Sequence, residues 1–430
     1  MKKVLSFLIT FVFVIILCSI TVFAQPFNFE AESYILIDSK TGLVLYEYNS
    51  DKILYPASTT KIMTAILAFE KGDPDQIMTA SKEAVYDIGK GGMNIGIMPG
   101  EEIRMENLLE AMLISSANEA ANIIAENICE SRQEFVDLMN EKARELGALN
   151  THFKNPCGAH DDDHYTTAAD LAKIASYAMK IQGFRDIVCK KSYQMPPTNK
   201  HSNWPELYSS NLLLRRMKSD LFEVNGIKTG YTGQAGQNLV SSAVNEEGME
   251  LIAIVLGVKN PDKAKKNTYQ YCYELLEYGF KNFSLYKIVE ANEKIKTIQV
   301  ADAGEDGALE LLAADTLECV LPNGESGQNS IKSREIIRPS IRAPINKGEV
   351  LGYMEYERNG IVLGRVNLIA SRTIEKFIPE PPKKTPEKKS TTLKKVLITA
   401  LIIILVFSVL RFILRRISRR RYIFRRRVRK

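Results

Sequence analysis

The pattern of hydrophobic and polar positions divides the chain into segments of different period. Two β-prone runs at 33–38 and 43–48 flank the turn Ser39-Lys40-Thr41-Gly42, which predicts a β-hairpin. The apolar run at 62–69 predicts a helix that begins near Ser58, because serine and threonine residues lead into it. Helical periodicity then recurs in four further segments. They are 108–114, 118–128, 135–146 and 167–179.

Strand-like sequence returns after this block of helices. Lys228-Thr229-Gly230 opens a strand, and two more strands follow at 238–244 and 249–258. A long helix is predicted at 260–281. Strands on both sides of a helical block predict one α/β domain, assigned to 25–284, whose sheet takes strands from both ends of the segment.

From about residue 288 the pattern changes to short β-rich pieces, which predict a small all-β domain at 285–378. These pieces are 295–300, 317–321, 349–355 and 361–369. The stretch rich in proline and lysine at 379–394 predicts a stiff, solvated linker.

The N-terminus carries a long apolar run. Lys2 and Lys3 precede the apolar residues 4–22, and Ala24 suits cleavage, so 1–24 is predicted to be a secretory signal peptide. An uncleaved anchor is the alternative, because the run is nearly long enough to span a bilayer.

A second apolar run lies near the C-terminus. It predicts a transmembrane helix at 395–414, and the basic residues at 415–430 predict a cytoplasmic tail by the positive-inside rule. A helix lying in the membrane interface is the alternative, but 396–410 has no polar face.

The formal charge of +6 is unevenly distributed along the chain. Residues 1–24 carry +2, 379–410 carry +4 and 411–430 carry +11, which leaves −11 on 25–378. An acidic body argues against nucleic acid as a partner. The basic tail, which directly follows an apolar span, favours anionic lipid head groups instead.

Ser58 and Lys61 are the first candidates for chemistry. Residues three apart share one face of a helix, so the Lys61 amine is expected under the Ser58 hydroxyl. A serine needs an adjacent base, and a lysine can be that base only if burial or nearby positive charge lowers its pKa. The apolar helix offers such burial, and the free N–H groups at its N-terminus favour an oxyanion over Ser58.

Ser-x-x-Lys is a loose pattern, and Ser284-Leu285-Tyr286-Lys287 repeats it where we predict a solvated turn after a helix. Two further motifs add information. Ser116 and Asn118 lie between two predicted helices, where a hydroxyl and an amide can point into a cleft. Lys228-Thr229-Gly230 supplies a cation for an anionic ligand and a glycine that lets the ligand approach the backbone.

These two motifs also have decoys, Ser209-Ser210-Asn211 and Lys40-Thr41-Gly42. Only one ordered set, however, runs Ser-x-x-Lys, Ser-x-Asn and Lys-Thr-Gly with the first motif on a helix and the last in a strand. The order therefore carries more information than any single motif.

This ordered set resembles that of the penicillin-recognising serine peptidases, and its flanks resemble the low-molecular-mass penicillin-binding proteins that are D-alanyl-D-alanine carboxypeptidases. The resemblance extends over roughly 30–281. The matching stretches are 38–42, 55–61, 115–120, 151–156, 164–168 and 225–230. It implies an antiparallel sheet flanked by helices, then a small all-β domain and a C-terminal transmembrane helix.

The resemblance also implies roles for individual residues. Ser58 is the nucleophile and Lys61 its base, while Ser116 and Asn118 relay protons and orient the substrate amide. The remaining site residues are Lys228 and Thr229, which contact the terminal carboxylate, Gly230 beside them, and Tyr231, whose N–H forms the oxyanion hole with that of Ser58.

The implied reaction is removal of the terminal D-alanine from peptidoglycan stem peptides ending in D-Ala-D-Ala, through an acyl-enzyme. β-Lactams are the implied covalent inhibitors, the membrane is a partner, and neither a cofactor nor a metal is implied.

Three differences from the family pattern bear on substrate preference. Tyr231 replaces a common histidine, Asn225 a common aspartate, and 91–94 lacks a serine after the glycines. An arginine that would assist carboxylate binding is not matched, and Lys259 or Lys263 is a weak substitute for it.

Two alternative functions remain open from the residues. One is another member of the superfamily, namely an endopeptidase, a transpeptidase or a β-lactamase, although no Glu-x-x-Leu-Asn segment of the class A β-lactamases is present. The other is a wall-binding scaffold with a dead site, which would not need both Ser58 and Lys61.

The histidines and cysteines give weaker indications of a functional site. His160-Asp161-Asp162-Asp163-His164 has metal-binding residue types, but in the resembling family this stretch is a loop beside the cleft. Five cysteines follow the signal segment without metal-type spacing, so buried thiols are expected rather than a disulfide framework.

Overall fold

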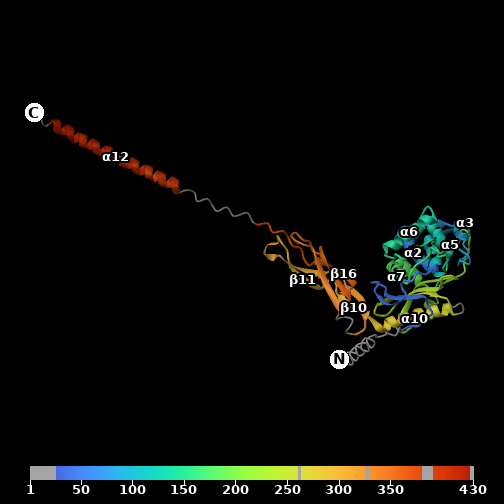
Figure 1. The fold of residues 1–430 in the computed structure, drawn as a ribbon. Coiled ribbons are helices and arrows are strands. Elements are labelled where there is room, and N and C mark those ends of the chain that lie inside the picture. The colour runs from blue at the N-terminus through green and yellow to red at the C-terminus, as the bar shows by residue number, and fades with distance from the viewer. Residues whose placement is uncertain (1–25, 260–262, 325–329, 380–390, 427–430) are drawn as a thin grey trace, which may run out of the picture.

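The structure is a computed structural model, and it describes residues 26–259, 263–324, 330–379 and 391–426. A five-stranded antiparallel sheet forms the centre of the first domain (Figure 1). Its spatial order is β2 (Val44–Tyr48), β1 (Ser33–Asp38), β9 (Glu250–Val258), β8 (Gly236–Val244) and β7 (Glu223–Thr232). The hairpin β1–β2 is confirmed, and the sheet takes strands from both ends of the segment as predicted.

Helices cover both faces of this sheet (Figure 1). Most lie on one face: α2 (Lys61–Lys71), α4 (Met105–Ile114), α5 (Asn118–Ile128), α6 (Arg132–Glu145) and α7 (Ala168–Ala178). The opposite face packs against α10 (Ala264–Asn282). The predicted helices are confirmed to within a few residues. The first residues of the one predicted at 260–281 lie outside the described residues.

The alternation of side chains in β1 explains how one strand serves two cores. Ile35 and Ile37 belong to the core shared with the larger group of helices, whereas Tyr34 and Leu36 belong to the core under α10. Successive side chains of a strand point to opposite faces, so a strand covered on both sides must be apolar throughout.

Helix α2 lies inside the larger core. Every residue from Lys61 to Ala68 is buried, which explains why this helix lacks the polar face of a surface helix. Burying each large apolar side chain such as Ile62 or Ile66 stabilises the fold by about 1.5–3 kcal/mol. The same burial places a lysine amine in an apolar surrounding, which has chemical consequences at the site.

Several short elements have too few residues for a periodic pattern and were not predicted. They are β3 (Ile77–Thr79), α3 (Lys82–Tyr86), β4 (Glu102–Arg104), α8 (Gln182–Val188), β5 (Ser192–Tyr193), β6 (Leu207–Tyr208) and α9 (Leu212–Arg216).

Three local predictions need correction. Ser58 lies in a separate 3₁₀ turn, η1 (Ala57–Thr60). No side chain caps α2, because the hydroxyl of its N-cap residue, Thr60, bonds the His164 ring 2.8 Å away instead. Lys228-Thr229-Gly230 lies inside β7 rather than at its start. Ser284-Leu285-Tyr286-Lys287 lies in β10 (Phe283–Val289), not in a solvated turn, because this β-prone segment pairs with β13 (Leu317–Pro322).

The second domain is all-β, as predicted. Besides β10 and β13 it contains a five-stranded sheet in the order β11 (Lys294–Gln299), β12 (Ala308–Ala313), β16 (Ile361–Ala370), β15 (Val350–Arg358) and β14 (Ile331–Ile337), and the short turn η2 (Gly304–Asp306). Strands β10, β12 and β14 were not predicted. The core of the second domain contains residues such as Leu309, Leu311 and Leu368.

The C-terminal segment forms one helix, α12 (Thr391–Arg426). Its part Leu393–Ser418 spans 26 residues and contains an 18-residue window with a mean hydropathy of 2.9, none of which is buried. By length and composition it is a candidate membrane span. The predicted signal at 1–24 and most of the predicted linker lie outside the described residues.

Candidate active site

The turn η1 leaves Ser58 more accessible than its neighbours. Ala57, Thr59 and Thr60 are buried, whereas Ser58 is half-buried. Ala57 has a φ of +50°, which is uncommon for a residue other than glycine and marks a tightly constrained entry to the turn. The nucleophile candidate is therefore the accessible residue of a rigid turn.

Lys61 is buried beneath Ser58. Its amine is 3.0 Å from Ser58 Oγ, 2.6 Å from Asn118 Oδ1 and 2.6 Å from the carbonyl oxygen of Cys157. Burial lowers its pKa from 10.5 to about 8, because the charged form loses hydration. In the neutral amine two N–H groups can bond Asn118 and Cys157, which leaves the lone pair for the Ser58 proton.

Asn118, the first residue of α5, is held from three directions. Its Oδ1 accepts from Lys61, its Nδ2 donates to the Ile88 carbonyl at 2.8 Å, and its backbone N–H donates to the Met93 carbonyl at 2.8 Å. Ser116, two residues earlier, is buried with a φ of +66° at the sharp junction between α4 and α5.

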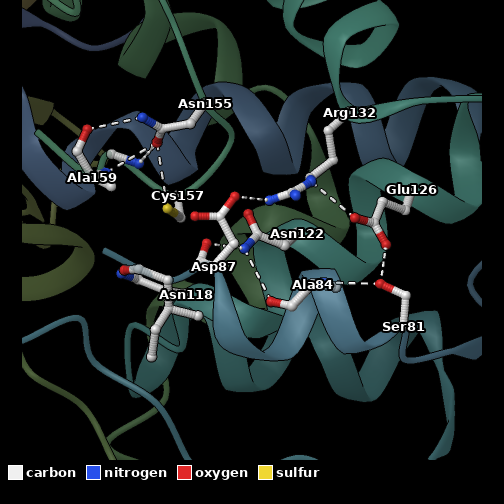
Figure 2. Close-up of polar contacts among 12 residues, drawn as sticks. Ser81, Ala84, Asp87, Asn118, Asn122, Glu126, Arg132, Asn155, Cys157 and Ala159 are labelled. Carbon is white, nitrogen blue, oxygen red and sulfur yellow. Dashed lines mark hydrogen bonds and ion pairs between the residues drawn. The ribbon is translucent and has the colours of Figure 1, made fainter. Parts of the chain in front are cut away.

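One face of α5 fixes the segment around residues 84–93 to the site (Figure 2). Asn122, one turn after Asn118, donates to the carbonyls of Ala84 at 3.1 Å and Asp87 at 2.9 Å. Gly92 in this segment has no room for a side chain, since a Cβ would lie 2.7 Å from Asn118 Nδ2. Met93, which follows the glycines, contacts Asn118 through its backbone carbonyl.

Asn155 organises the loop 155–159, which packs against the turn that carries Ser58. Sequence reasoning assigned no role to Asn155. Its Oδ1 accepts from the N–H groups of Gly158 at 2.7 Å and Ala159 at 3.0 Å, and its Nδ2 donates to the Ala159 carbonyl at 2.9 Å (Figure 2). This folding turns the Cys157 carbonyl to Lys61. The only sequence signal was the match of 151–156 to the resembling family.

Gly158 packs directly against the nucleophile turn. Its φ is +83°, and a Cβ there would lie 2.0 Å from the Ala57 carbonyl oxygen and 3.0 Å from the Ser58 nitrogen. Glycine is required for both reasons. The loop and the turn therefore hold each other in place.

Strand β7 passes along the other side of Ser58. A Cβ at Gly230 would lie 2.8 Å from the Pro56 carbonyl oxygen and 3.1 Å from the Ser58 nitrogen, so only glycine permits this approach. Tyr231, the next residue, has an exposed fraction of 65%. Asn238 on β8 ties the strands to the turn by donating to the Tyr55 and Pro56 carbonyls at 2.9 and 3.1 Å.

Lys228 is fully buried, and its amine donates to the Thr229 carbonyl at 3.1 Å. Burial, with a smaller effect from the charge of Lys61, lowers its pKa well below 10.5. Within the described residues no carboxylate lies at ion-pair distance from this amine. A buried amine without a carboxylate partner favours binding of an external anion, which stabilises the charged form of the amine.

The structure thus brings Ser58, Lys61, Asn118 and Gly230 into one site, with Lys228 close enough to affect Lys61 electrostatically. Comparison with known proteins identifies the family of the chain. The family described as D-alanyl-D-alanine carboxypeptidase matches residues 20–260. The D-alanyl-D-alanine carboxypeptidase DacF of Bacillus subtilis (strain 168) is 32% identical over 349 residues, covering 81% of this chain and 86% of DacF.

The chain belongs to the D-alanyl-D-alanine carboxypeptidase family. Its second domain matches the C-terminal domain of penicillin-binding protein 5 at residues 283–376. The crystal structure of penicillin-binding protein 5 from Haemophilus influenzae superposes with a TM-score of 0.66 at 28% identity, covering 82% of this chain and all of that one. The D-alanyl-D-alanine endopeptidase of Haemophilus influenzae is 30% identical, but over only 56% of this chain and 79% of its own.

Within the part of the chain that the structure describes, three further residues that the sequence analysis singled out, Lys259, Lys263 and Asn225, have no contact with the site residues that an observed hydrogen bond or ion pair shows. Lys259 pairs with Glu32 at 3.2 Å, and Lys263 is exposed. Asn225 donates to Glu250 at 2.7 Å and accepts from Ser242 at 2.6 Å, so it belongs to a structural network.

The histidines of the loop at 160–164 have different surroundings. His160 is 3.4 Å from Asp162. His164 is buried 2.8 Å from the Thr60 hydroxyl, and burial lowers its pKa to about 3, so it is neutral and supports the turn. Within the described ranges no group of three or more His, Cys, Asp or Glu residues has metal-binding geometry.

The five cysteines of the described residues are all free thiols. Cys157, Cys272 and Cys319 are buried, Cys129 is half-buried and Cys189 is exposed. The expectation of buried thiols is therefore right for three of the five, and no disulfide framework links them.

Proposed function

We propose that this chain removes the terminal D-alanine from peptidoglycan stem peptides as a serine-type D-alanyl-D-alanine carboxypeptidase, with Ser58 as nucleophile and Lys61 as base. The observation that carries the proposal is the 3.0 Å contact between the Ser58 hydroxyl and a buried amine whose pKa is lowered to about 8. A lysine with this pKa is partly neutral at neutral pH, so it can accept a proton.

Acylation follows from these positions. Ser58 Oγ attacks the carbonyl carbon between the last two D-alanines, and its proton passes to Lys61. The N–H groups of Ser58 and Tyr231 stabilise the oxyanion. The C–N bond then breaks, Ser116 relays the proton to the departing amine, and free D-alanine leaves. Asn118 orients the substrate amide and keeps Lys61 in place.

Deacylation completes the cycle. A water molecule attacks the ester carbon, the bond to Ser58 Oγ breaks, and the serine recovers a proton by way of Lys61. A β-lactam acylates the same oxygen, and the absence of a Glu-x-x-Leu-Asn segment favours a long-lived adduct. The β-lactam is thus the proposed covalent inhibitor.

Lys228 and Thr229 are proposed to bind the terminal carboxylate of the substrate. Lys228 is a buried amine without a carboxylate partner in the described part of the chain, and an arriving carboxylate stabilises its charged form and so raises its pKa. A site built for a free carboxylate suits a substrate that ends just beyond the scissile bond.

An endopeptidase is the second candidate, because an endopeptidase is among the relatives. The test incubates the protein with diacyl-Lys-D-Ala-D-Ala and, separately, with cross-linked peptide dimers, and quantifies free D-alanine and monomers by chromatography. We expect free D-alanine, lost in Ser58→Ala. Cleavage of dimers without release of D-alanine would replace the proposal with the endopeptidase. A scaffold would give neither product and would not bind a reporter penicillin covalently.

We also propose that Leu393–Ser418 anchors the protein in the membrane, with the catalytic domain outside and the basic tail in the cytoplasm. The proposed organisation is a signal at 1–24, a catalytic domain at 25–284, a β domain at 285–378, a linker at 379–394, a transmembrane helix at 395–414 and a tail at 415–430. Support comes from the apolar span and from the basic residues after it.

A further inference from the structure

Ser210, which sequence reasoning set aside as part of a decoy motif, lies beside the proposed carboxylate site. It follows β6 and directly precedes Asn211, the N-cap of α9. Its hydroxyl oxygen is 2.7 Å from Thr229 Oγ1. Nineteen residues separate the two along the chain, so the contact is a tertiary one.

The backbone of Ser210 is held between two helices. Its N–H donates to the carbonyl of Ile114, the last residue of α4, at 3.0 Å. Its carbonyl accepts from the Tyr269 hydroxyl of α10 at 2.9 Å. Asn211 donates from Nδ2 to the Gly226 carbonyl of β7 at 3.1 Å. Ser210 therefore links the helix end that leads into Ser116 to the strand that carries Lys228 and Thr229.

The direction of the hydrogen bond between the two hydroxyls depends on the ligand. A hydroxyl has one proton, so Thr229 can donate either to Ser210 or to a bound group. A carboxylate only accepts, which obliges Thr229 to donate to it. The Thr229 oxygen is then free to accept, and Ser210 becomes its donor.

We infer that Ser210 is a positioning residue for substrate recognition: it donates to Thr229 and so directs the Thr229 proton at the terminal carboxylate. The inference rests on the proposed function of Thr229. In such a chain each hydrogen bond polarises the next, and the bond to a charged acceptor is stronger than one between neutral groups. The contribution of Ser210 is therefore specific to ligands that carry a negative charge at this point.

The test compares Ser210→Ala with the matched control Ser209→Ala. The Ser209 hydroxyl accepts from the Asn211 N–H at 3.2 Å, so its loss removes a serine hydroxyl one residue away without touching Thr229. Ser210→Thr keeps the hydroxyl and serves as the rescue variant. The probes are a reporter penicillin with a free carboxylate and the methyl ester of the same penicillin.

For Ser210→Ala we expect a fall of about tenfold in the second-order acylation rate with the free acid and a change within about twofold with the ester. With diacyl-Lys-D-Ala-D-Ala, KM should rise while kcat changes little. Ser210→Thr should recover most of the loss, and Ser209→Ala should behave as the parent with both probes. In a Thr229→Val background the Ser210→Ala change should have no further effect.

Equal losses with the acid and the ester would overturn the inference, because they would show a general structural effect. Unchanged rates with both probes would overturn it as well. A parent protein that reacts with neither probe would instead contradict the proposed function, so the two failures are distinguishable.

Discussion

Lys61 Nζ lies 3.0 Å from Ser58 Oγ although the two residues belong to different helical elements, the 3₁₀ turn η1 and the helix α2. The 3₁₀ geometry has 3.0 residues per turn, so side chains at positions i and i+3 eclipse. An α-helix would offset them around the axis by about 60°. The turn that differs from the predicted α-helix therefore aligns the nucleophile with its base more closely.

The first prediction concerns the pH dependence of acylation. The pKa of Lys61 is lowered to about 8, and the protonated amine cannot accept the Ser58 proton. The second-order rate with a reporter penicillin should therefore rise about tenfold per pH unit below about pH 7.5 and level off above about pH 8.5. Stopped-flow fluorescence between pH 5.5 and 9.5 measures it. A rate that is flat from pH 6 to pH 9 would contradict the assignment of Lys61 as base.

Lys61→Arg provides the control for this profile. Arginine stays protonated throughout the range, so this variant should show almost no acylation at any pH. Its fold should be checked by circular dichroism. Near-normal acylation by a folded Lys61→Arg protein would place the base elsewhere.

The second prediction concerns Gly158. Gly158→Ala would place an alanine at a φ of +83°, and its Cβ would lie only 2.0 Å from the Ala57 carbonyl oxygen. The loop and the nucleophile turn must therefore move apart. We expect the free energy of unfolding to fall by about 2–4 kcal/mol and acylation to fall by about a hundredfold or more. Thermal melting and reporter penicillin labelling measure the two effects.

Gly147→Ala is the matched control, because Gly147 has a φ of +73° but nothing within 4 Å of its added Cβ. It should cost only about 1 kcal/mol of stability and leave acylation unchanged. If the two variants behave alike, backbone strain alone explains the loss, and the contact with Ala57 has no separate role.

The third prediction concerns Lys228. Lys228→Met removes a buried amine that has no carboxylate partner in the described residues, so the free protein should become equally or more stable. Substrate should bind more weakly, with kcat/KM for diacyl-Lys-D-Ala-D-Ala lowered by about a hundredfold. Steady-state kinetics and thermal melting are the measurements.

Lys259→Met is the control for Lys228→Met, since Lys259 pairs with Glu32 and is mostly exposed. It should change kcat/KM by less than about twofold. A large loss in Lys259→Met together with a small loss in Lys228→Met would transfer carboxylate recognition to Lys259.

The fourth prediction concerns the membrane anchor. A chain that ends at Pro386 lacks the apolar span Leu393–Ser418 and should remain in the supernatant after ultracentrifugation, whereas the full chain should pellet with washed membranes. Both should react with a reporter penicillin at the same rate. Sedimentation of the shortened chain with membranes would identify the apolar residues 4–22 as an uncleaved anchor.

The sequence alone determined the main helices and strands and the order of the three site motifs along the chain. The apolar runs 62–69 and 249–258 became the helix α2 and the strand β9. Local sequence distinguishes them, because serine and threonine residues lead into the first run, whereas the second is rich in β-branched residues and follows a turn at 245–248. The motifs at Ser58, Ser116 and Lys228 could be read from residue types and spacing, and family membership confirmed the resemblance on which their roles were proposed.

The tertiary structure alone decided what surrounds Ser58 and Lys61. The Cys157 carbonyl that holds Lys61 is a backbone group, and a backbone group has no residue-specific signature in the sequence. The contact of Gly158 with Ala57 and that of Ser210 with Thr229 join segments that are distant along the chain. Local patterns cannot specify such pairs, because the pairs exist only after the sheet and the helices have packed.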